Sequence, residues 1–172
     1  LSQYGANPDR REKSGIRAAV IREKGTNSER EMAYSFWLAG FDVKDVTMTD
    51  LISGRETLDE VNFIVFCGGF SNSDVLGSAK GWAGGFLYNP KAKAALDRFY
   101  AREDTLSLGI CNRCQLMMEL NLITPEFDKR GYLRHNNSHK FESSFVGVNI
   151  PQNNSVLFGS LSNSRLGVWV AH

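Results

Sequence analysis

Residues 106–116 read LSLGICNRCQL, and this stretch decides the fold. Residues 106–110 form an apolar run typical of a buried strand, and residues 115–122 have the spacing of a helix. Cys111 therefore falls at the turn between a strand and a helix. A side chain at such a turn, called a nucleophile elbow, is pushed out of a sharp bend over the positive end of the helix. A thiol there has a reason to ionise, and because a thiolate is a strong nucleophile, we expect an enzyme.

Composition and charge exclude several classes of protein. At 172 residues, one domain with a sizeable core is expected. The net charge is +1 and the charges are interspersed, so we expect no nucleic-acid partner. No apolar stretch approaches the roughly 20 residues that span a bilayer, so we expect no membrane partner. Three cysteines, an odd number, argue against a disulfide scaffold and favour a reducing, cytoplasmic location.

Two segments are expected along the chain. Residues 1–15 are charged, contain Gly and Pro and show no periodicity, which predicts a linker. Residues 16–172 are expected to form one domain. Because the chain stops directly after an apparent strand, we expect this domain to be truncated at its C-terminus and to belong to a longer polypeptide.

Strands and helices are expected to alternate along this domain. The predicted strands are residues 16–22, 41–47, 61–67 and 106–110, followed by later strands at 146–150 and 166–171. Ser28 and Glu31 have the spacing of a capping box at the start of a helix. Gly40 is placed to end that helix, and Pro90 suits the first position of another. This order predicts an α/β fold in which a mostly parallel sheet is sandwiched by helices, as in flavodoxin-like proteins.

Three segments are expected to meet at the carboxyl ends of the strands, where ligands collect in such sheets. They are residues 25–27, residues 68–71 and Cys111. The backbone N–H of Asn112, at the start of the helix, is not paired within the helix and can stabilise an oxyanion. Gly69 is expected to give the second N–H, because no side chain blocks its approach.

The other cysteines and the histidines leave alternatives open. Cys67 ends an apolar strand and is expected to pack in the core. Cys111 and Cys114 have Cys-x-x-Cys spacing, so a thiol–disulfide redox protein is an alternative, with Cys114 expected to face inward. His135 and His139 are four residues apart, but the residues between them suit a loop, so no metal site is expected there.

Several motifs together resemble a known family. Residues 109–115 (GICNRCQ) resemble the nucleophile motif of the class I, triad-type glutamine amidotransferases. Residues 21–32 (IREKGTNSEREM), 67–71 (CGGFS) and 74–77 (DVLG) look like segments of the C-terminal glutaminase domain of the large, single-chain phosphoribosylformylglycinamidine synthase family. The resemblance covers residues 16–172 and implies an amidotransferase-like fold.

The resemblance implies hydrolysis of glutamine. Cys111 would attack the side-chain amide, release ammonia and leave a glutamyl thioester that water then clears. Asn112 and Gly69 would supply the oxyanion amides. Three residues would hold the substrate glutamine: Gln115, Phe70 and Ser71.

The resemblance also implies a partner and cofactors outside this domain. The ammonia would pass to a synthetase domain of the same polypeptide, where ATP and magnesium activate formylglycinamide ribonucleotide in purine biosynthesis. No cofactor and no metal are expected in the glutaminase domain itself. A catalytically silent module that docks on the synthetase domain is a further alternative.

The sequence departs from the family pattern at two points. The family has Gly two residues after the nucleophile, whereas this chain has Arg113, whose side chain is expected to crowd the elbow or to project into the pocket. The family's catalytic His and Glu lie in a His-Pro-Glu element, which this sequence does not contain. His172 instead matches the first residue of an earlier His-Gly-Glu-Gly-like element. The chain is therefore expected to hold the nucleophile without its base.

Overall fold

The computed structural model describes residues 12–77, 79–129 and 131–172, which divide into two compact units. The larger unit ends at Leu133, and the smaller unit contains the chain from Arg134 to His172. Most of the linker predicted over residues 1–15 lies outside the described residues. Within its described part, the backbone N–H and the hydroxyl of Ser14 both donate to the Gly40 carbonyl, at 2.8 and 2.9 Å.

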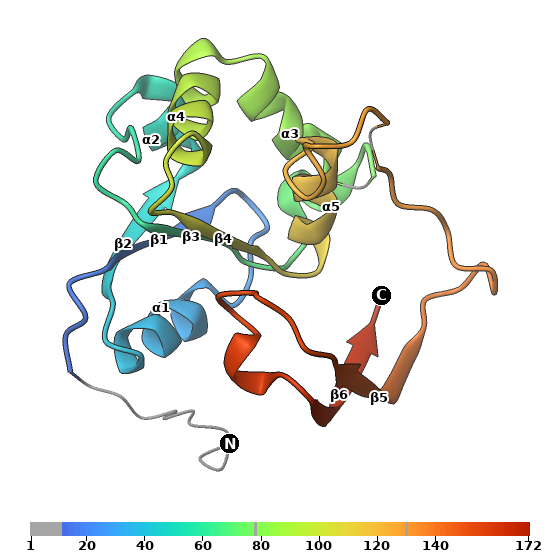
Figure 1. Ribbon diagram of the computed structural model, residues 1–172. Helices are drawn as coiled ribbons and strands as arrows, with labels where there is room; N and C mark the ends of the chain where they lie inside the picture. The colour runs from blue at the N-terminus through green and yellow to red at the C-terminus, as the bar shows by residue number, and fades with distance from the viewer. Residues whose placement is uncertain (1–11, 78, 130) are drawn as a thin grey trace. The chain divides into compact units, whose positions relative to one another are not determined.

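The larger unit is built on a four-stranded parallel sheet in the order β2-β1-β3-β4 (Figure 1). The strands are β1 (Arg17–Arg22), β2 (Asp42–Thr47), β3 (Phe63–Phe66) and β4 (Leu106–Gly109). Each strand lies within two residues of its predicted bounds, and the largest difference is at β3, which starts two residues later and ends one residue earlier than predicted. The predicted parallel sheet is therefore confirmed.

Helices cover both faces of this sheet. Helix α1 (Glu29–Leu38) lies on one side in Figure 1, and α2 (Met48–Ser53), α3 (Lys80–Leu87) and α4 (Pro90–Tyr100) lie on the other. Helix α5 (Asn112–Glu119) packs its Leu116 and Met117 into the same apolar cluster as α2, α3 and α4. The sandwich that the sequence predicted is therefore confirmed.

Alternate residues of each strand supply the two apolar cores. Ala19 and Ile21 of β1 belong to the larger cluster, in which the Phe66 ring packs edge-on against Trp82. The residues between them on β1 face the smaller cluster under α1, which also contains Cys67. Cys67 is buried as predicted, and its burial raises the pKa of its thiol to about 11.

The starts of two helices differ from the prediction. Ser28 has φ 66° and ψ 19°, and its side chain makes no cap hydrogen bond, so the predicted capping box is wrong. A capping residue needs an extended backbone to direct its oxygen at the first turn, and the left-handed conformation of Ser28 prevents this. Helix α5 begins at Asn112, three residues before the prediction, because the chain reverses at Cys111 itself.

The end of α1 and the start of α4 follow their sequence signals. Gly40 has φ 90°, and the N–H of Phe41 donates to the Phe36 carbonyl at 3.0 Å, which closes α1 as predicted. Pro90 is the first residue of α4. The side chain of Asn89 accepts from the backbone N–H groups of Lys91 and Ala92, at 3.1 and 2.9 Å.

The smaller unit is an antiparallel pair of strands, β5 (Ser143–Ile150) and β6 (Ser164–Ala171), with the short helix η3 (Gly159–Leu161) in their connection. Both predicted strands are present and longer than predicted, and they form a separate two-stranded sheet. His172 continues their pairing, since its N–H and carbonyl exchange hydrogen bonds with Glu142 at 2.9 and 2.8 Å.

His135 and His139 precede β5 and lie outside any strand or helix. Over the part of the chain that the structure describes, no group of three or more His, Cys, Asp or Glu side chains is arranged to hold a metal ion. Among the same residues, no helix combines the length and the apolar character needed to cross a membrane.

The two helix starts make a testable pair. Asn89→Ala removes a side chain that caps two backbone N–H groups, so it is expected to lower the free energy of unfolding by about 1 kcal/mol. Ser28→Ala removes no cap and is expected to change it by less than about 0.5 kcal/mol. Urea denaturation followed by circular dichroism measures both, and an equal loss in the two variants would contradict the capping assignment.

Candidate active site

Cys111 stands at the strand–helix turn that the sequence predicted. Its backbone has φ 57° and ψ −121°, and the residue is exposed. The N–H of Ile110 still pairs with the Phe66 carbonyl at 3.2 Å, so the sheet holds the chain up to the residue before the turn. A residue other than glycine at this φ is strained, and such strain gathers at functional sites.

Gly109 allows β4 and α5 to pack closely beneath this turn. A Cβ at Gly109 would come within 2.5 Å of the Met117 Sδ and 2.8 Å of the Arg113 carbonyl oxygen. Neither distance is compatible with a side chain, and the second atom is backbone that cannot move aside. Strand and helix therefore approach each other so closely that only glycine fits at this position.

The three segments expected at the carboxyl ends of the strands do meet. Asn27 donates its backbone N–H to the Gly68 carbonyl at 2.9 Å, and Thr26 forms an isolated bridge with Gly69. Gly69 has φ 98°, and a Cβ there would lie 2.3 Å from the Gly25 carbonyl oxygen. A Cβ at Gly68 would lie 3.5 Å from the Cβ of Cys111, so the glycine pair passes directly beside the thiol residue.

The side chain of Asn112 connects the elbow to its surroundings. It is 2% exposed, and its Nδ2 donates to Gln115 Oε1 at 2.7 Å and to Asp74 Oδ2 at 3.3 Å. Its Oδ1 accepts from the Ser71 hydroxyl at 3.4 Å and from the Arg113 guanidinium. As the first residue of α5, Asn112 has no helical carbonyl one turn earlier to accept its backbone N–H.

The predicted substrate-holding residues differ in exposure. The Phe70 side chain is 67% exposed beside the glycine pair. Ser71 is buried, and its hydroxyl is engaged with Asn112. Gln115 is half-buried on the first turns of α5 and uses its Oε1 for the bond to Asn112. The structure thus connects Ser71 and Gln115 to Asn112, and the substrate role of all three stays a prediction.

Arg113 does not project into a pocket, which corrects the expectation from the sequence. It is 0% exposed and turns inward beneath the elbow, where its guanidinium carbon lies 4.3 Å from the centroid of the Trp82 ring. Burial lowers the pKa of its guanidinium to about 10, so the side chain is still charged at neutral pH. Where strand β4 and helix α5 approach each other closely, at Gly109, the nearest atom of Arg113 is its backbone carbonyl oxygen and not its side chain. The arginine side chain therefore fits in the space beneath the elbow.

The loop after the glycine pair is strained. Asn72, Ser73 and Asp74 have φ values of 50°, 57° and 49°, so three successive side-chain-bearing residues are left-handed. Asp74 accepts through Oδ1 from the backbone N–H of Ala79 at 2.9 Å, and through Oδ2 from Asn112. The sequence analysis did not predict the contact of Asp74 with the elbow. Asn72 and Asp74 are of the residue types that tolerate a left-handed backbone best, and their presence was the sequence signal for this conformation.

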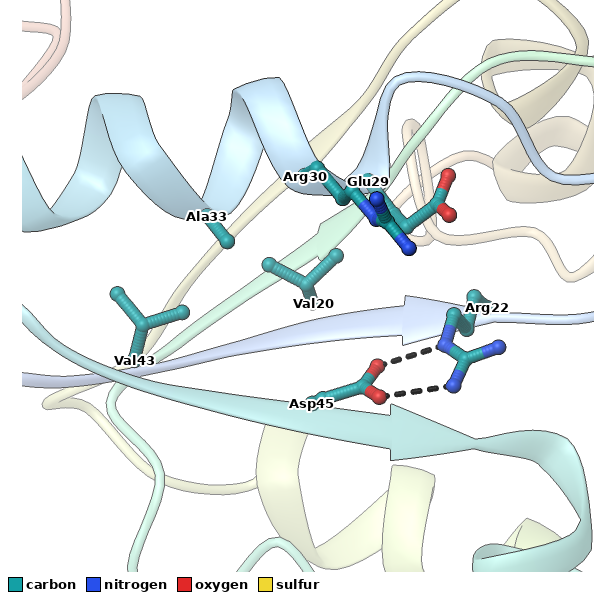
Figure 2. Close-up of a pocket in the computed structure, with 7 residues that line it drawn as sticks. All are labelled: Val20, Arg22, Glu29, Arg30, Ala33, Val43 and Asp45. Atoms are coloured by element: carbon teal, nitrogen blue, oxygen red, sulfur yellow. Dashed lines mark hydrogen bonds and ion pairs between the residues drawn. The ribbon is translucent and has the colours of Figure 1, made fainter.

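A cavity of about 440 Å³ lies apart from Cys111, between α1 and strands β1 and β2 (Figure 2). Arg22 and Asp45 form a two-fold hydrogen-bonded ion pair at 2.7 and 2.8 Å on its rim. The cavity is lined by Val20, Arg22, Glu29, Arg30, Ala33, Val43 and Asp45. None of the predicted site residues lines it, so it does not contribute to the elbow.

Comparison with known proteins identifies the family. Residues 15–172 match the model of the CobB/CobQ-like glutamine amidotransferase domain. The chain belongs to this family. All three cysteines, Cys67, Cys111 and Cys114, are free in the structure.

Several relatives resemble nearly the whole chain. It is 44% identical over 168 residues to phosphoribosylformylglycinamidine synthase of Drosophila melanogaster, 95% of this chain. It is 47% identical over 158 residues to the probable enzyme of that name from Caenorhabditis elegans, 91% of this chain. A structure described as PurLQS from Thermotoga maritima matches with a TM-score of 0.69 and 25% identity, covering 91% of this chain and 66% of that one. The chain spans only 12% of the length of these two curated relatives.

The packing at Gly109 can be tested against a matched glycine. Gly109→Ala is expected to lower the free energy of unfolding by about 1–3 kcal/mol, because the new Cβ meets the Arg113 carbonyl and Met117. Gly81→Ala places a Cβ within α3 with its nearest neighbour 4.0 Å away, and is expected to raise stability by about 0.5–1 kcal/mol. Urea denaturation of both variants checks the prediction, which fails if Gly109→Ala is as stable as the unaltered chain.

Proposed function

We propose that this chain is the glutaminase part of a phosphoribosylformylglycinamidine synthase, with Cys111 as its nucleophile. The observation that carries the proposal is the exposed Cys111 at the strained strand–helix turn, in a chain of the glutamine amidotransferase family. Identities of 44 and 47% to segments of synthases with that name support the choice within the family.

The proposed reaction is a two-step acyl transfer. The Cys111 sulfur attacks the side-chain carbonyl carbon of glutamine, and the carbonyl oxygen becomes an oxyanion. The carbon–nitrogen bond then breaks, and the nitrogen takes up a proton and leaves as ammonia. Water attacks the remaining thioester, which releases glutamate and restores the thiol.

Two backbone N–H groups are proposed to stabilise the oxyanion. Asn112 starts α5, so its N–H is free of helical pairing and lies at the positive end of the helix. Gly69 belongs to the glycine pair beside Cys111 and has no side chain to obstruct the substrate. Removing one such donor costs a factor of about 10²–10³ in rate in other enzymes, so this pair is a large part of the proposed catalysis.

Substrate glutamine is proposed to lie against Gln115, Phe70 and Ser71. The Oε1 of Gln115 accepts from Asn112, which fixes the amide so that its Nε2 is directed elsewhere and can donate to the substrate. The exposed Phe70 ring offers an apolar surface for the aliphatic part of glutamine. Ser71 acts through its hydrogen bond to Asn112, which holds the first turn of α5 in place.

We assign the base that takes the thiol proton to none of the residues of this chain. The sequence contains no His-Pro-Glu element, and His172 is bonded through its backbone to Glu142 in the smaller unit. Because His172 is not part of such an element, it receives no base role.

In the complete protein, ammonia is proposed to pass to a synthetase domain of the same polypeptide. ATP and magnesium are proposed to activate formylglycinamide ribonucleotide on that synthetase domain. We propose a cytoplasmic location, which the odd number of free cysteines supports. One relative, from Arabidopsis thaliana, is named as chloroplastic/mitochondrial.

Covalent labelling tests the nucleophile. A glutamine-like diazo-ketone is expected to alkylate Cys111 in the complete natural polypeptide, and mass spectrometry locates the label. Cys67 is expected to stay unlabelled at pH 8, because burial raises the pKa of its thiol to about 11 and keeps it protonated. Cys114→Ser is the matched control and is expected to label normally.

Each alternative predicts a different labelling result. A label on Cys67 or Cys114 contradicts the proposed nucleophile. A reversible Cys111–Cys114 disulfide, detected by thiol titration, indicates redox chemistry instead. A protein that binds its synthetase domain but neither glutamine nor the reagent is a docking module.

A second prediction follows from the absence of a His-Pro-Glu element in this sequence. The 172 residues alone are expected to hydrolyse glutamine far more slowly than a polypeptide that continues through a His-Pro-Glu element, because the thiol lacks its proton acceptor. Ammonia release from the two proteins, measured at equal concentration, checks this. Equal rates would contradict it and would make His172 the leading candidate for the base.

A further inference from the structure

The charged group of Arg113 is buried beneath the elbow. No carboxylate among the described residues forms an ion pair with it, although it is 0% exposed. Burying an unpaired charge is costly unless hydrogen bonds compensate it. The acceptors that this guanidinium uses therefore indicate what the residue does.

Those acceptors belong to all three segments that form the site. Nη1 donates to the Gly69 carbonyl at 3.0 Å and to the side-chain oxygen of Asn112. Nη2 donates to the Thr26 hydroxyl at 3.1 Å and to the Gly68 carbonyl at 3.4 Å. Only Nε lacks a hydrogen-bond partner among the described residues. One planar group thus connects the loop after β1, the glycine pair after β3 and the first turn of α5.

These contacts fix the direction of two peptide groups. In a trans peptide the carbonyl and the N–H point in opposite directions. With the Gly68 and Gly69 carbonyls held towards the guanidinium, the N–H groups of Gly69 and Phe70 face away from it. A flipped peptide would aim an N–H donor at the donors of Arg113, which is unfavourable. The flat face of the guanidinium rests on Trp82, so the group itself has little freedom to turn.

We propose that Arg113 is a positioning residue that holds the glycine pair in the orientation needed for oxyanion stabilisation. The inference rests on the proposed glutaminase function and adds to it a side chain that never touches the substrate. It reverses the expectation that an arginine at this position crowds the elbow.

Three variants of the complete natural polypeptide test the inference. Arg113→Met keeps most of the volume but removes every donor, so kcat for glutamine hydrolysis is expected to fall about 10- to 100-fold, less than for loss of a direct oxyanion donor. KM is expected to change less than about threefold, because the loss falls on the transition state. Arg113→Lys keeps the charge and some donors and is expected to recover part of kcat. Arg113→Gly is expected to be slower than the unaltered protein.

Arg102 provides a matched control. Its Nη1 donates to the carbonyls of Leu58, Asp59 and Val61, at 3.2, 2.9 and 3.0 Å, near the opposite end of β3. Arg102→Met therefore removes the same kind of contact away from the site. It is expected to lower stability without changing kcat, so a purely structural role of Arg113 would give the same result as Arg102→Met.

A readout that needs no activity separates the two hypotheses. Amide hydrogen exchange of a peptide spanning residues 67–75 is expected to be about tenfold faster in Arg113→Met and unchanged in Arg102→Met. If the unaltered protein shows no Cys111-dependent hydrolysis, the proposed function fails and exchange alone decides the inference. Unchanged exchange in Arg113→Met, an unchanged kcat in an active protein, or a faster Arg113→Gly would each overturn it.

Discussion

The close approach of α5 to β4 at Gly109 is the constraint on which the rest of the site depends. With no room for a Cβ between strand and helix, the chain has to reverse within one residue, and Cys111 takes the left-handed backbone that this requires. The same reversal starts α5 at Asn112, so the N–H of Asn112, which has no partner within the helix, directly follows the thiol residue, while those of Arg113 and Cys114 donate to the Ile110 and Cys111 carbonyls. One packing contact, at Gly109, thus accounts for three features: the strained backbone of Cys111, its exposure, and its position at the positive end of α5.

A second constraint acts on the opposite wall of the site. The glycine pair is held by the Thr26–Gly69 bridge on one side and by the Arg113 guanidinium on the other. The carbonyls of the pair accept from the Asn27 N–H and from the guanidinium, so in trans peptides the N–H groups of Gly69 and Phe70 point away from these donors. A side chain at Gly69 would displace the Gly25 carbonyl, which is why this wall is built from backbone.

The sequence predicted those features that depend on neighbouring residues. The turn at Cys111 and the end of α1 at Gly40 each follow from short-range pattern and backbone freedom. The spacing of Ser28 and Glu31 wrongly predicted a capping box. Such a box also needs an extended backbone at its first residue, whereas Ser28, in the loop after β1, has a left-handed backbone. The pairing of β5 with β6 could not be predicted, since alternation shows that a strand exists but not its partner.

The direction of the Arg113 side chain likewise could not be predicted from neighbouring residues in the sequence. Its direction depends on Thr26, Gly68 and Gly69, which lie 44 to 87 residues earlier in the chain. Because these acceptors are backbone or hydroxyl groups rather than carboxylates, no charge pattern in the sequence points to them. The site combines two different kinds of part as a result. The glycine pair proposed to stabilise the oxyanion is backbone already held by Arg113, whereas the proposed proton transfer needs a titratable base, which is a different kind of group. In such a domain the groups that stabilise the oxyanion can all be in place, while the rate of the reaction is still limited by removal of the proton from the thiol.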